Sequence, residues 1–370
     1  MFEEAGDVFR SQLDKTSRPG AGASGWVLPQ FETEFGATIR DVEMAYETHG
    51  VLSLSGDNVV WLCHALTGDA HVADGDGRPG WWGALIGSGK AIDTDRFFVV
   101  SANVLGGCSG TTGPASAAPG GEWAYGSTFP EVTIRDMVAA QKVLADHLGV
   151  RRILAVMGGS MGGMQALEWA VMYPELVGKA VVIAADPQFS AMGIAYNDVM
   201  RQAILTDSHY HGGDYLRYGE FPEQGLRVAR MLGMISYRTA TLFQERFGRE
   251  VLDGEFQINR YLRYQGDKLV RRFDAQSYLA LLRAMDTHDI GRDRDGLASA
   301  FARIRAELVW VGIDDDLLYS PATLRQAVEF ATSCGVNARY EHIASVFGHD
   351  AFLIEFEQLR HILQVILQMP

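Results

Sequence analysis

The sequence has few cysteines, no long apolar runs and no cluster of basic residues. Its three cysteines, Cys63, Cys108 and Cys334, are far apart and odd in number. That pattern fits neither a disulfide framework nor a zinc signature, so we expect no bound metal and interpret the cysteines as buried or free thiols. No window approaches the roughly 18 apolar residues that a membrane-spanning helix needs, and the first 25 residues lack the apolar core of a signal peptide. We therefore expect a cytoplasmic protein that does not bind membranes.

Positive charge is also scarce. The net charge of −14 over 370 residues argues against a nucleic-acid binder, because contacts to phosphate need clustered lysine and arginine. The composition is 47% apolar and 10% aromatic, which is enough to bury a sizeable core. A chain of this length predicts one large domain with an insertion, or two domains.

Short apolar runs and helical patterns alternate through much of the chain. The runs are typical of parallel strands covered on both faces, and they lie at Val59–Cys63, Phe97–Ala102, Ile153–Met157, Ala180–Ala185 and Leu308–Ile313. Between them, helical spacing predicts helices at Ile134–Leu148 and Met161–Tyr173, the second ended by Pro174. Near the start, Phe31–Phe35 and part of Asp41–Thr48 alternate apolar and polar residues, as half-solvated antiparallel strands do. This order predicts an α/β fold with a mostly parallel central sheet and helices on both faces.

One long segment, residues 186–298, interrupts this rhythm. It lacks short apolar runs, and its patterns predict helices, for example at Gln224–Tyr237 and Ser277–Thr287. We interpret it as a helical lid inserted into a core domain of residues 31–185 and 299–370, preceded by an N-terminal segment of residues 1–30. The core then ends with a predicted helix at Phe352–Leu367. A lid at a strand end is physically sensible, because strand ends carry the functional loops of open α/β sheets.

A serine motif follows the predicted strand at Ile153–Met157. The residues from Gly158 to Gly163 read Gly-Gly-Ser-Met-Gly-Gly, which contains the pattern G-x-S-x-G and leads into a predicted helix. In this strand–turn–helix context the pattern is typical of the nucleophile turn of α/β hydrolases, because only small residues fit beside a serine in so tight a turn. Glycine-rich turns elsewhere bind phosphate or nothing, so the pattern alone would be weak. The context makes Ser160 the candidate nucleophile.

A nucleophilic serine needs a base, and the base needs an acid that orients it; in this fold they follow in the order serine, aspartate, histidine. The predicted strand at Leu308–Ile313 runs into Asp314, Asp315 and Asp316. One of these aspartates is the expected acid, and the others are expected to be solvated or to cap a helix.

The histidine is chosen by its position. His349 lies in a predicted loop between a strand candidate at Ala338–His342 and the last helix, which is where the base of this fold belongs. His64 follows the strand Val59–Cys63, in the loop that supplies an oxyanion-hole amide. We therefore interpret His64 as a residue that shapes this loop and not as the base.

Several further segments, in one order along the chain, resemble the homoserine O-acetyltransferases of the MetX type, a family with the α/β-hydrolase fold. They are His64–Gly68, Asn103–Cys108, Gly110–Pro114, Thr133–Asp136, Gly158–Gly163, Gly266–Leu269, His288–Asp289 and Gly348–Asp350. The resemblance spans about residue 30 to the end. It implies transfer of an acetyl group from acetyl-CoA to the hydroxyl of L-homoserine through an acyl-serine.

The resemblance also implies roles for individual residues. The family pattern Asp-x-Leu-Tyr matches Asp316 and makes it the acid. The oxyanion hole would consist of the backbone amides of Leu66 and Met161. Arg230 would bind the α-carboxylate and Asp350 the α-ammonium of the amino acid, pairings that agree with the geometry of these groups.

Some alternatives stay open. Arg227 lies one helical turn from Arg230 and competes with it for the substrate carboxylate. Asp315 and Ser320 depart from the family pattern around the acid, and residues 120–125 depart from it where the acyl donor could be chosen. Close relatives use succinyl-CoA or accept L-serine.

Two other functions have to be separated from acyl transfer. An esterase would use the same three residues with water as the acceptor, and a binding protein could have kept the fold without the activity. Acyl transfer through serine needs a base and an oxyanion hole, so we expect no cofactor, with acetyl-CoA acting as a substrate. The family also suggests a homodimer.

Overall fold

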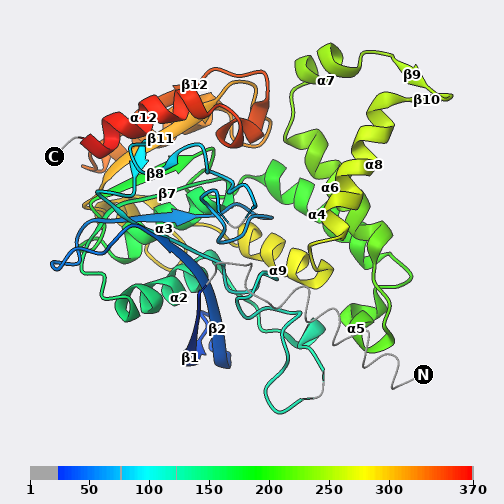
Figure 1. Ribbon diagram of the computed structural model, residues 1–370, viewed down its shortest axis with the longest axis horizontal. Helices are drawn as coiled ribbons and strands as arrows, with labels where there is room; N and C mark the ends of the chain where they lie inside the picture. The colour runs from blue at the N-terminus through cyan, green and yellow to red at the C-terminus, as the bar shows by residue number, and fades with distance from the viewer. Residues whose placement is uncertain (1–23, 76, 122, 369–370) are drawn as a thin grey trace.

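The computed structural model describes residues 24–75, 77–121 and 123–368. Its centre is an eight-stranded sheet in the order β1-β2-β6-β3-β7-β8-β11-β12 (Figure 1). In that order the strands span Ser24–Glu32, Thr38–His49, Phe98–Ala102, Val59–Cys63, Ile153–Gly159, Lys179–Ile183, Glu307–Ile313 and Ala338–Ile343. The strands from β6 to β12 are parallel, whereas β2 pairs antiparallel with β6 and β1 pairs antiparallel with β2. The predicted, mostly parallel sheet is confirmed.

The start of the sheet differs from the prediction. Strand β1 begins at Ser24, inside the segment of residues 1–30 that we placed outside the core. Pro29 breaks the alternating pattern, but β1 is an edge strand, where the missing N–H of proline is tolerated. The predicted strand Phe31–Phe35 is wrong beyond Glu32, because the chain turns there, with the Gly36 N–H donating to the Thr33 carbonyl at 2.8 Å.

Helices cover both faces of the sheet. In Figure 1, α2 (Ile134–His147) lies on one side and α12 (Phe356–Gln368) on the other. The first begins with a capping box in which Thr133 and Asp136 each accept the other's backbone N–H. The last helix starts four residues later than predicted, because Gly348–Leu353 forms a 3-10 turn. The remaining core elements are α3 (Met161–Met172), α10 (Leu297–Ala302), α11 (Pro321–Ser333), β4 (Ile86–Gly87) and β5 (Ile92–Asp93).

A buried polar chain links the core to the loop that follows β3. The indoles of Trp61 and Trp169 both donate to the Gln141 side-chain oxygen, at 3.3 and 2.9 Å. Gln141 in turn donates to Gln165, and Gln165 donates to the backbone oxygen of His64 at 3.1 Å. Gln141 therefore occupies an apolar helix face because each of its polar atoms has a partner.

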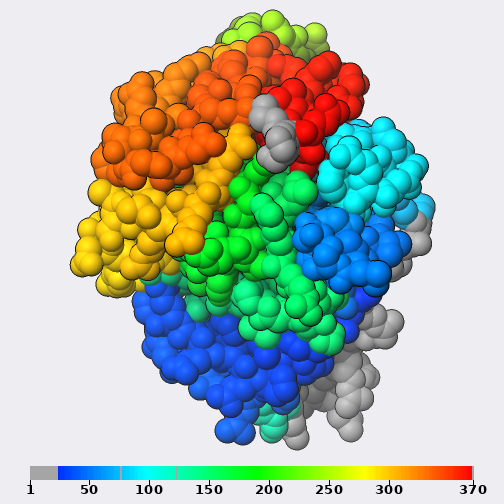
Figure 2. Space-filling view, turned by 90° about the vertical axis from the view of Figure 1, so that its left-hand side faces the viewer, coloured from blue at the N-terminus to red at the C-terminus, as the bar shows by residue number. Residues whose placement is uncertain are grey.

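The segment predicted as a lid is mainly helical and lies to one side of the sheet (Figure 1). We call residues 186–298 the lid. Its elements are α4 (Ala191–Leu205), α5 (Tyr215–Tyr218), α6 (Glu223–Ser236), α7 (Ala240–Phe247), α8 (Gln257–Val270), α9 (Ala275–Asp286) and a small hairpin of β9 (Val251–Leu252) and β10 (Glu255–Phe256). From the side away from the lid, Figure 2 shows mainly the core, with a small part of the lid at the top. In the described ranges, we find no helix that combines the length and apolar character needed to cross a bilayer.

Candidate active site

The backbone at Ser160 has the geometry of a nucleophile turn. Ser160 stands between β7 and α3 with φ 57° and ψ −125°, a conformation that costs energy for a residue with a side chain. Its neighbours must be small: a Cβ on Gly162 would lie 2.1 Å from the Cys63 backbone oxygen, and one on Gly158 would lie 2.4 Å from it. The turn aims Ser160, which is 7% exposed, at the carboxyl edge of the sheet.

His349 and Asp316 form a buried pair at the same edge. His349 Nδ1 lies 2.8 Å from Asp316 Oδ2, and the other carboxylate oxygen accepts the N–H groups of Leu318 and Tyr319 at 2.8 and 3.0 Å. Burial lowers the pKa of His349, but the charge and hydrogen bond of Asp316, with a further contribution from Asp350, raise it above its usual 6.5. Because Asp316 accepts at Nδ1, the pair leaves Nε2 to act as the base.

The structure separates the three consecutive aspartates. Asp314 pairs with His342 at 2.8 Å, Asp315 is exposed with φ 51°, and Asp316 is 5% exposed. The choice of Asp316 as partner of His349 is therefore supported by contacts, and its catalytic role remains a prediction.

Tyr319 contacts two of the three predicted catalytic residues. Its backbone N–H binds Asp316, and its ring stacks on the His349 imidazole with centroids 5.4 Å apart. Burial, followed by the charges of Asp186 and Asp316, raises the pKa of the Tyr319 phenol well above its usual value, while the neighbouring Ser160 side chain lowers it. Asp316 and His349 thus both contact one fully buried tyrosine, which the sequence had shown only as part of a pattern. The hydroxyl of this tyrosine has no hydrogen-bond partner among the described residues.

The loop after β3 is shaped by His64, as predicted. The N–H of Val104 donates to His64 Nε2 at 3.1 Å, so the ring proton sits on Nδ1, which donates to the Ala65 oxygen at 2.8 Å. Burial lowers the pKa of His64, which agrees with a neutral ring. This loop presents Leu66, whereas Met161 is the first residue of α3 and has a backbone N–H without a helical acceptor. Both amides belong to the segments that border Ser160, and their role as an oxyanion hole stays a prediction.

The contacts of Arg227 distinguish it from Arg230. Arg227 donates to Asp267 on α8 and to Gln224, so it holds two lid helices together. The guanidinium of Arg230 instead lies 5.7 Å from the ring centroid of Tyr237. The Tyr237 ring in turn lies 5.5 Å from the His349 imidazole. Arg230 and His349 are therefore both neighbours of the Tyr237 ring.

Asp350 already has a partner. Its carboxylate lies 2.9 Å from Arg238 Nη2, and both side chains are mostly buried. Sequence reasoning missed Arg238, which carries no motif. Its position directly after α6, the helix of Arg230, was the one available signal.

A second carboxyl group, Asp186, lies near Asp316. It lies in the loop after β8, separated from the strand by Ala184 and Ala185, and is 5% exposed. Burial, and then the charge of Asp316, raises its pKa to about 7. Sequence reasoning missed this residue too, although an aspartate in the loop after a core strand is the kind of position that marks a functional edge.

The cysteines behave as structural residues in the described ranges. Cys108 is buried, accepts the Asp274 N–H at 3.5 Å, and has its pKa raised to about 12, chiefly by burial. Among the described residues, no group of three or more histidine, cysteine, aspartate or glutamate side chains is arranged to hold a metal ion.

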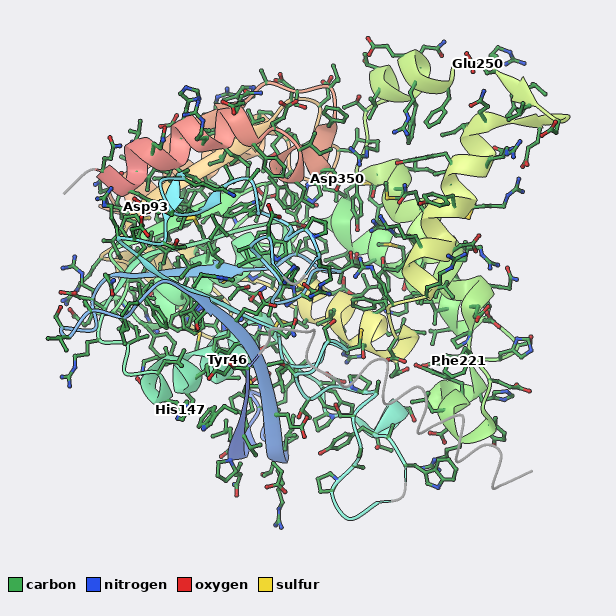
Figure 3. All side chains as sticks on the ribbon, in the orientation of Figure 1. Tyr46, Asp93, His147, Phe221, Glu250 and Asp350 are labelled. Carbon is green, nitrogen blue, oxygen red and sulfur yellow. The ribbon has the colours of Figure 1, made fainter. Side chains whose placement is uncertain are left out.

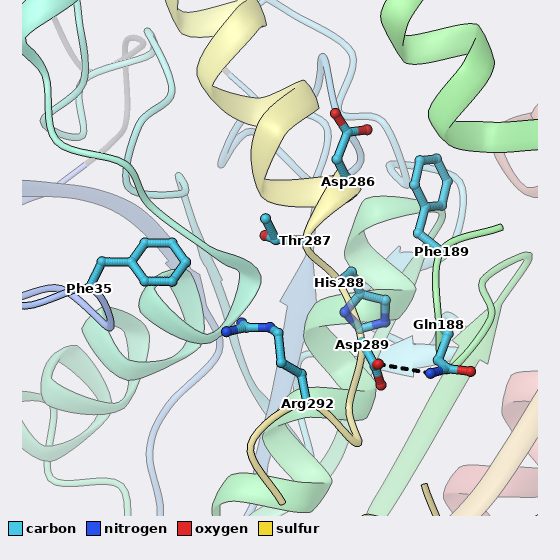
Figure 4. A pocket seen from close by; sticks show the side chains of 8 residues that line it. All are labelled: Phe35, Gln188, Phe189, Asp286, Thr287, His288, Asp289 and Arg292. Carbon is cyan, nitrogen blue, oxygen red and sulfur yellow. Dashed lines mark hydrogen bonds between the residues drawn. The ribbon is translucent and has the colours of Figure 1, made fainter. Parts of the chain in front are cut away.

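A separate pocket of about 480 Å³ lies between the lid and the β1–β2 turn (Figure 4). Its charged groups already have partners: Arg292 pairs with Glu34, and Asp289 accepts from Gln188 at 2.8 Å. It contains none of the predicted site residues. We therefore keep the edge around Ser160 as the candidate active site.

The chain is similar in sequence and structure to known α/β hydrolases. A family model described as alpha/beta hydrolase fold matches residues 58–356. The homoserine O-acetyltransferase of Carboxydothermus hydrogenoformans is 47% identical over 356 residues, covering 92% of this chain and 93% of that protein. The structure of homoserine O-acetyltransferase from Bacillus anthracis superposes with a TM-score of 0.88 at 27% identity, covering 94% of this chain and 97% of that one. Esterase E22 superposes with a TM-score of 0.87 at 29% identity, covering 94% and 99%.

Proposed function

The chain belongs to the homoserine O-acetyltransferase family of α/β hydrolases, and we propose that it transfers the acetyl group of acetyl-CoA to L-homoserine through an acetylated Ser160. The observation that supports this choice most is the pairing of two features in one site. The His349 imidazole of the buried His349–Asp316 pair lies 5.5 Å from the Tyr237 ring. The guanidinium of Arg230, for which no ion pair is found among the described residues, lies 5.7 Å from the same ring. An esterase for simple esters needs no such cation beside its base.

In the first half-reaction, the Ser160 hydroxyl attacks the thioester carbon while His349 Nε2 takes its proton. Asp316 holds the imidazole in the right tautomer and stabilises its positive form. The amides of Leu66 and Met161 would donate to the oxygen that becomes negative. The tetrahedral intermediate then collapses, the carbon–sulfur bond breaks, and the proton of His349 leaves with the CoA thiol.

In the second half-reaction, the homoserine hydroxyl attacks the acetyl-serine carbon and gives its proton to His349. Collapse breaks the bond to Ser160, which recovers its proton from His349, and O-acetylhomoserine leaves. Arg230 would pair with the α-carboxylate and Asp350 with the α-ammonium, which fixes the hydroxyl against the acyl group.

Hydrolysis is the second candidate, because the likeness to esterase E22 is as close in structure as the likeness to the acetyltransferase. The two functions differ in what resolves the acetyl-enzyme. We expect CoA release from acetyl-CoA to depend on added homoserine; release at the same rate without any alcohol would favour the hydrolase. Parallel assays with succinyl-CoA and with L-serine test the choice of donor and acceptor.

We also propose that the enzyme is a cytoplasmic homodimer that needs no cofactor. Exposed apolar side chains on the lid support a dimer interface there, among them Met192, Val199, Val228, Ile235 and Tyr264. Light scattering of the purified protein tests this, and a monomer at micromolar concentration would contradict it.

A further inference from the structure

The lid segment that follows α6 is joined to the loop of the catalytic histidine. The Thr239 hydroxyl donates to the Val346 oxygen at 2.5 Å, and the Asp350 N–H donates to the Tyr237 oxygen at 3.4 Å. The backbones approach closely here, since a Cβ on Gly348 would lie 3.1 Å from the Thr239 side chain. Figure 3 shows Asp350 at this junction of core and lid.

The Arg238–Asp350 ion pair lies at the centre of this junction. Arg238 Nη2 is 2.9 Å from Asp350 Oδ2, with side-chain exposures of 15% and 16%. The guanidinium also lies 5.8 Å from the ring centroid of Phe347. Its Nε is buried without a hydrogen-bond partner in the described part of the chain. The ion pair is made through Oδ2 of Asp350.

Asp350 and Arg230 carry opposite charges, and both charges shift the pKa of the Tyr237 phenol. Burial raises the pKa of Tyr237, the positive charge of Arg230 lowers it, and the negative charge of Asp350 raises it. Opposite charges in a mostly buried site attract each other strongly. If Asp350 turned toward Arg230, both groups that the proposed function assigns to the amino acid would be occupied before the substrate arrives.

We propose that Arg238 is a positioning residue for acceptor recognition, which holds Asp350 away from Arg230 and presents its carboxylate to the α-ammonium. The inference rests on the proposed function, because it names what keeps that acceptor site open. With Arg238 in place, the three side chains carry one net positive charge, and the Arg230 guanidinium stays available for the α-carboxylate of the substrate. Without it, the two charges that should bind substrate bind each other.

The test compares Arg238→Met, Arg238→Lys, Asp350→Asn and the double variant Arg238→Met/Asp350→Asn. For Arg238→Met we expect the KM for homoserine to rise by about 30-fold, the order of loss seen when one partner of a desolvated charge pair is removed. Acetylation of the enzyme by acetyl-CoA, followed in a single turnover without acceptor, should change by less than about threefold. Arg238→Lys keeps the charge, so its KM should lie between those of the wild type and Arg238→Met.

The matched control is Arg260→Met, which removes an exposed lid arginine that pairs with Asp253. Its KM should be unchanged.

The double variant separates positioning from packing. If Arg238 acts through Asp350, the double variant has the same KM as Asp350→Asn, because the effects of residues acting as a unit do not add. An unchanged KM in Arg238→Met, or additive losses in the double variant, would overturn the inference. If Arg238→Met fails to fold, the KM of the uncharged variant Arg238→Gln decides, and a wild-type value there overturns it. Failure of the proposed function looks different, since wild-type protein would then release no CoA in response to homoserine.

Discussion

Replacing Asp186 by asparagine should stabilise the protein, and more so as the pH rises. Asp186 is 5% exposed in the loop after β8, and its Oδ1 has no hydrogen-bond partner in the described ranges. Asp316 carries a like charge nearby. Burial and that charge raise the pKa of Asp186 from 3.8 to about 7. Asparagine has nearly the same shape and cannot ionise, so the variant removes only the cost of the charge.

The sign and size follow from the two pKa values. Below pH 3.8 the carboxyl is neutral in both folded and unfolded chains, so it contributes no pH-dependent term. Between that pH and about 7 the unfolded chain loses the proton while the folded protein keeps it, so stability falls as pH rises. Above about pH 7 the full loss of folding stability is reached. It is roughly 4 kcal/mol, from 1.36 kcal/mol for each pH unit between the two pKa values.

Urea unfolding of both proteins at pH 4.5 and pH 8 measures this difference. We expect the stability advantage of Asp186→Asn over wild type to grow by roughly 3 kcal/mol between the two pH values. Asp315→Asn is the matched control, because Asp315 is exposed and asparagine tolerates its positive φ. Stability curves of Asp186→Asn and wild type that stay parallel across pH would refute the reasoning, since the carboxyl would then ionise freely.

Two further predictions concern the triad and the acceptor site. Asp316→Asn should lower the rate of CoA release by about 10³–10⁴-fold, because an amide favours the wrong tautomer of His349; a loss below tenfold in the steady-state assay would argue that Asp316 does not orient the base. Arg230→Met should raise the KM for homoserine on the order of 100-fold, since a charge-assisted pair is lost. Arg227→Met should leave that KM within about threefold and instead lower the thermal midpoint, because it loses Asp267; equal KM values for the two arginine variants would contradict the assignment.

The sheet and the nucleophile turn were predictable because local rules dictate them. The apolar run Val59–Cys63 forms β3 with the predicted bounds, since a strand buried on both faces has to be apolar throughout. The G-x-S-x-G pattern predicted the turn at Ser160 because a side chain at Gly158 or Gly162 would collide with backbone. Neither inference needs knowledge of distant contacts.

The features that were missed depend on pairings between distant segments. The start of β1 at Ser24 is fixed by its partner β2, while its own pattern is broken by Pro29. Arg238 has meaning only beside Asp350, which lies more than a hundred residues away along the chain. The sequence could not show which of the three aspartates is buried, and only the family pattern selected Asp316.

The measurement that tests the central claim most directly is intact mass spectrometry of the protein after brief exposure to acetyl-CoA, with the modified peptide then sequenced. We predict one added acetyl group on Ser160, lost within seconds when L-homoserine is added and never formed in Ser160→Ala. Homoserine-dependent CoA release without any acetyl adduct, or an adduct and turnover that persist in Ser160→Ala, would contradict the account.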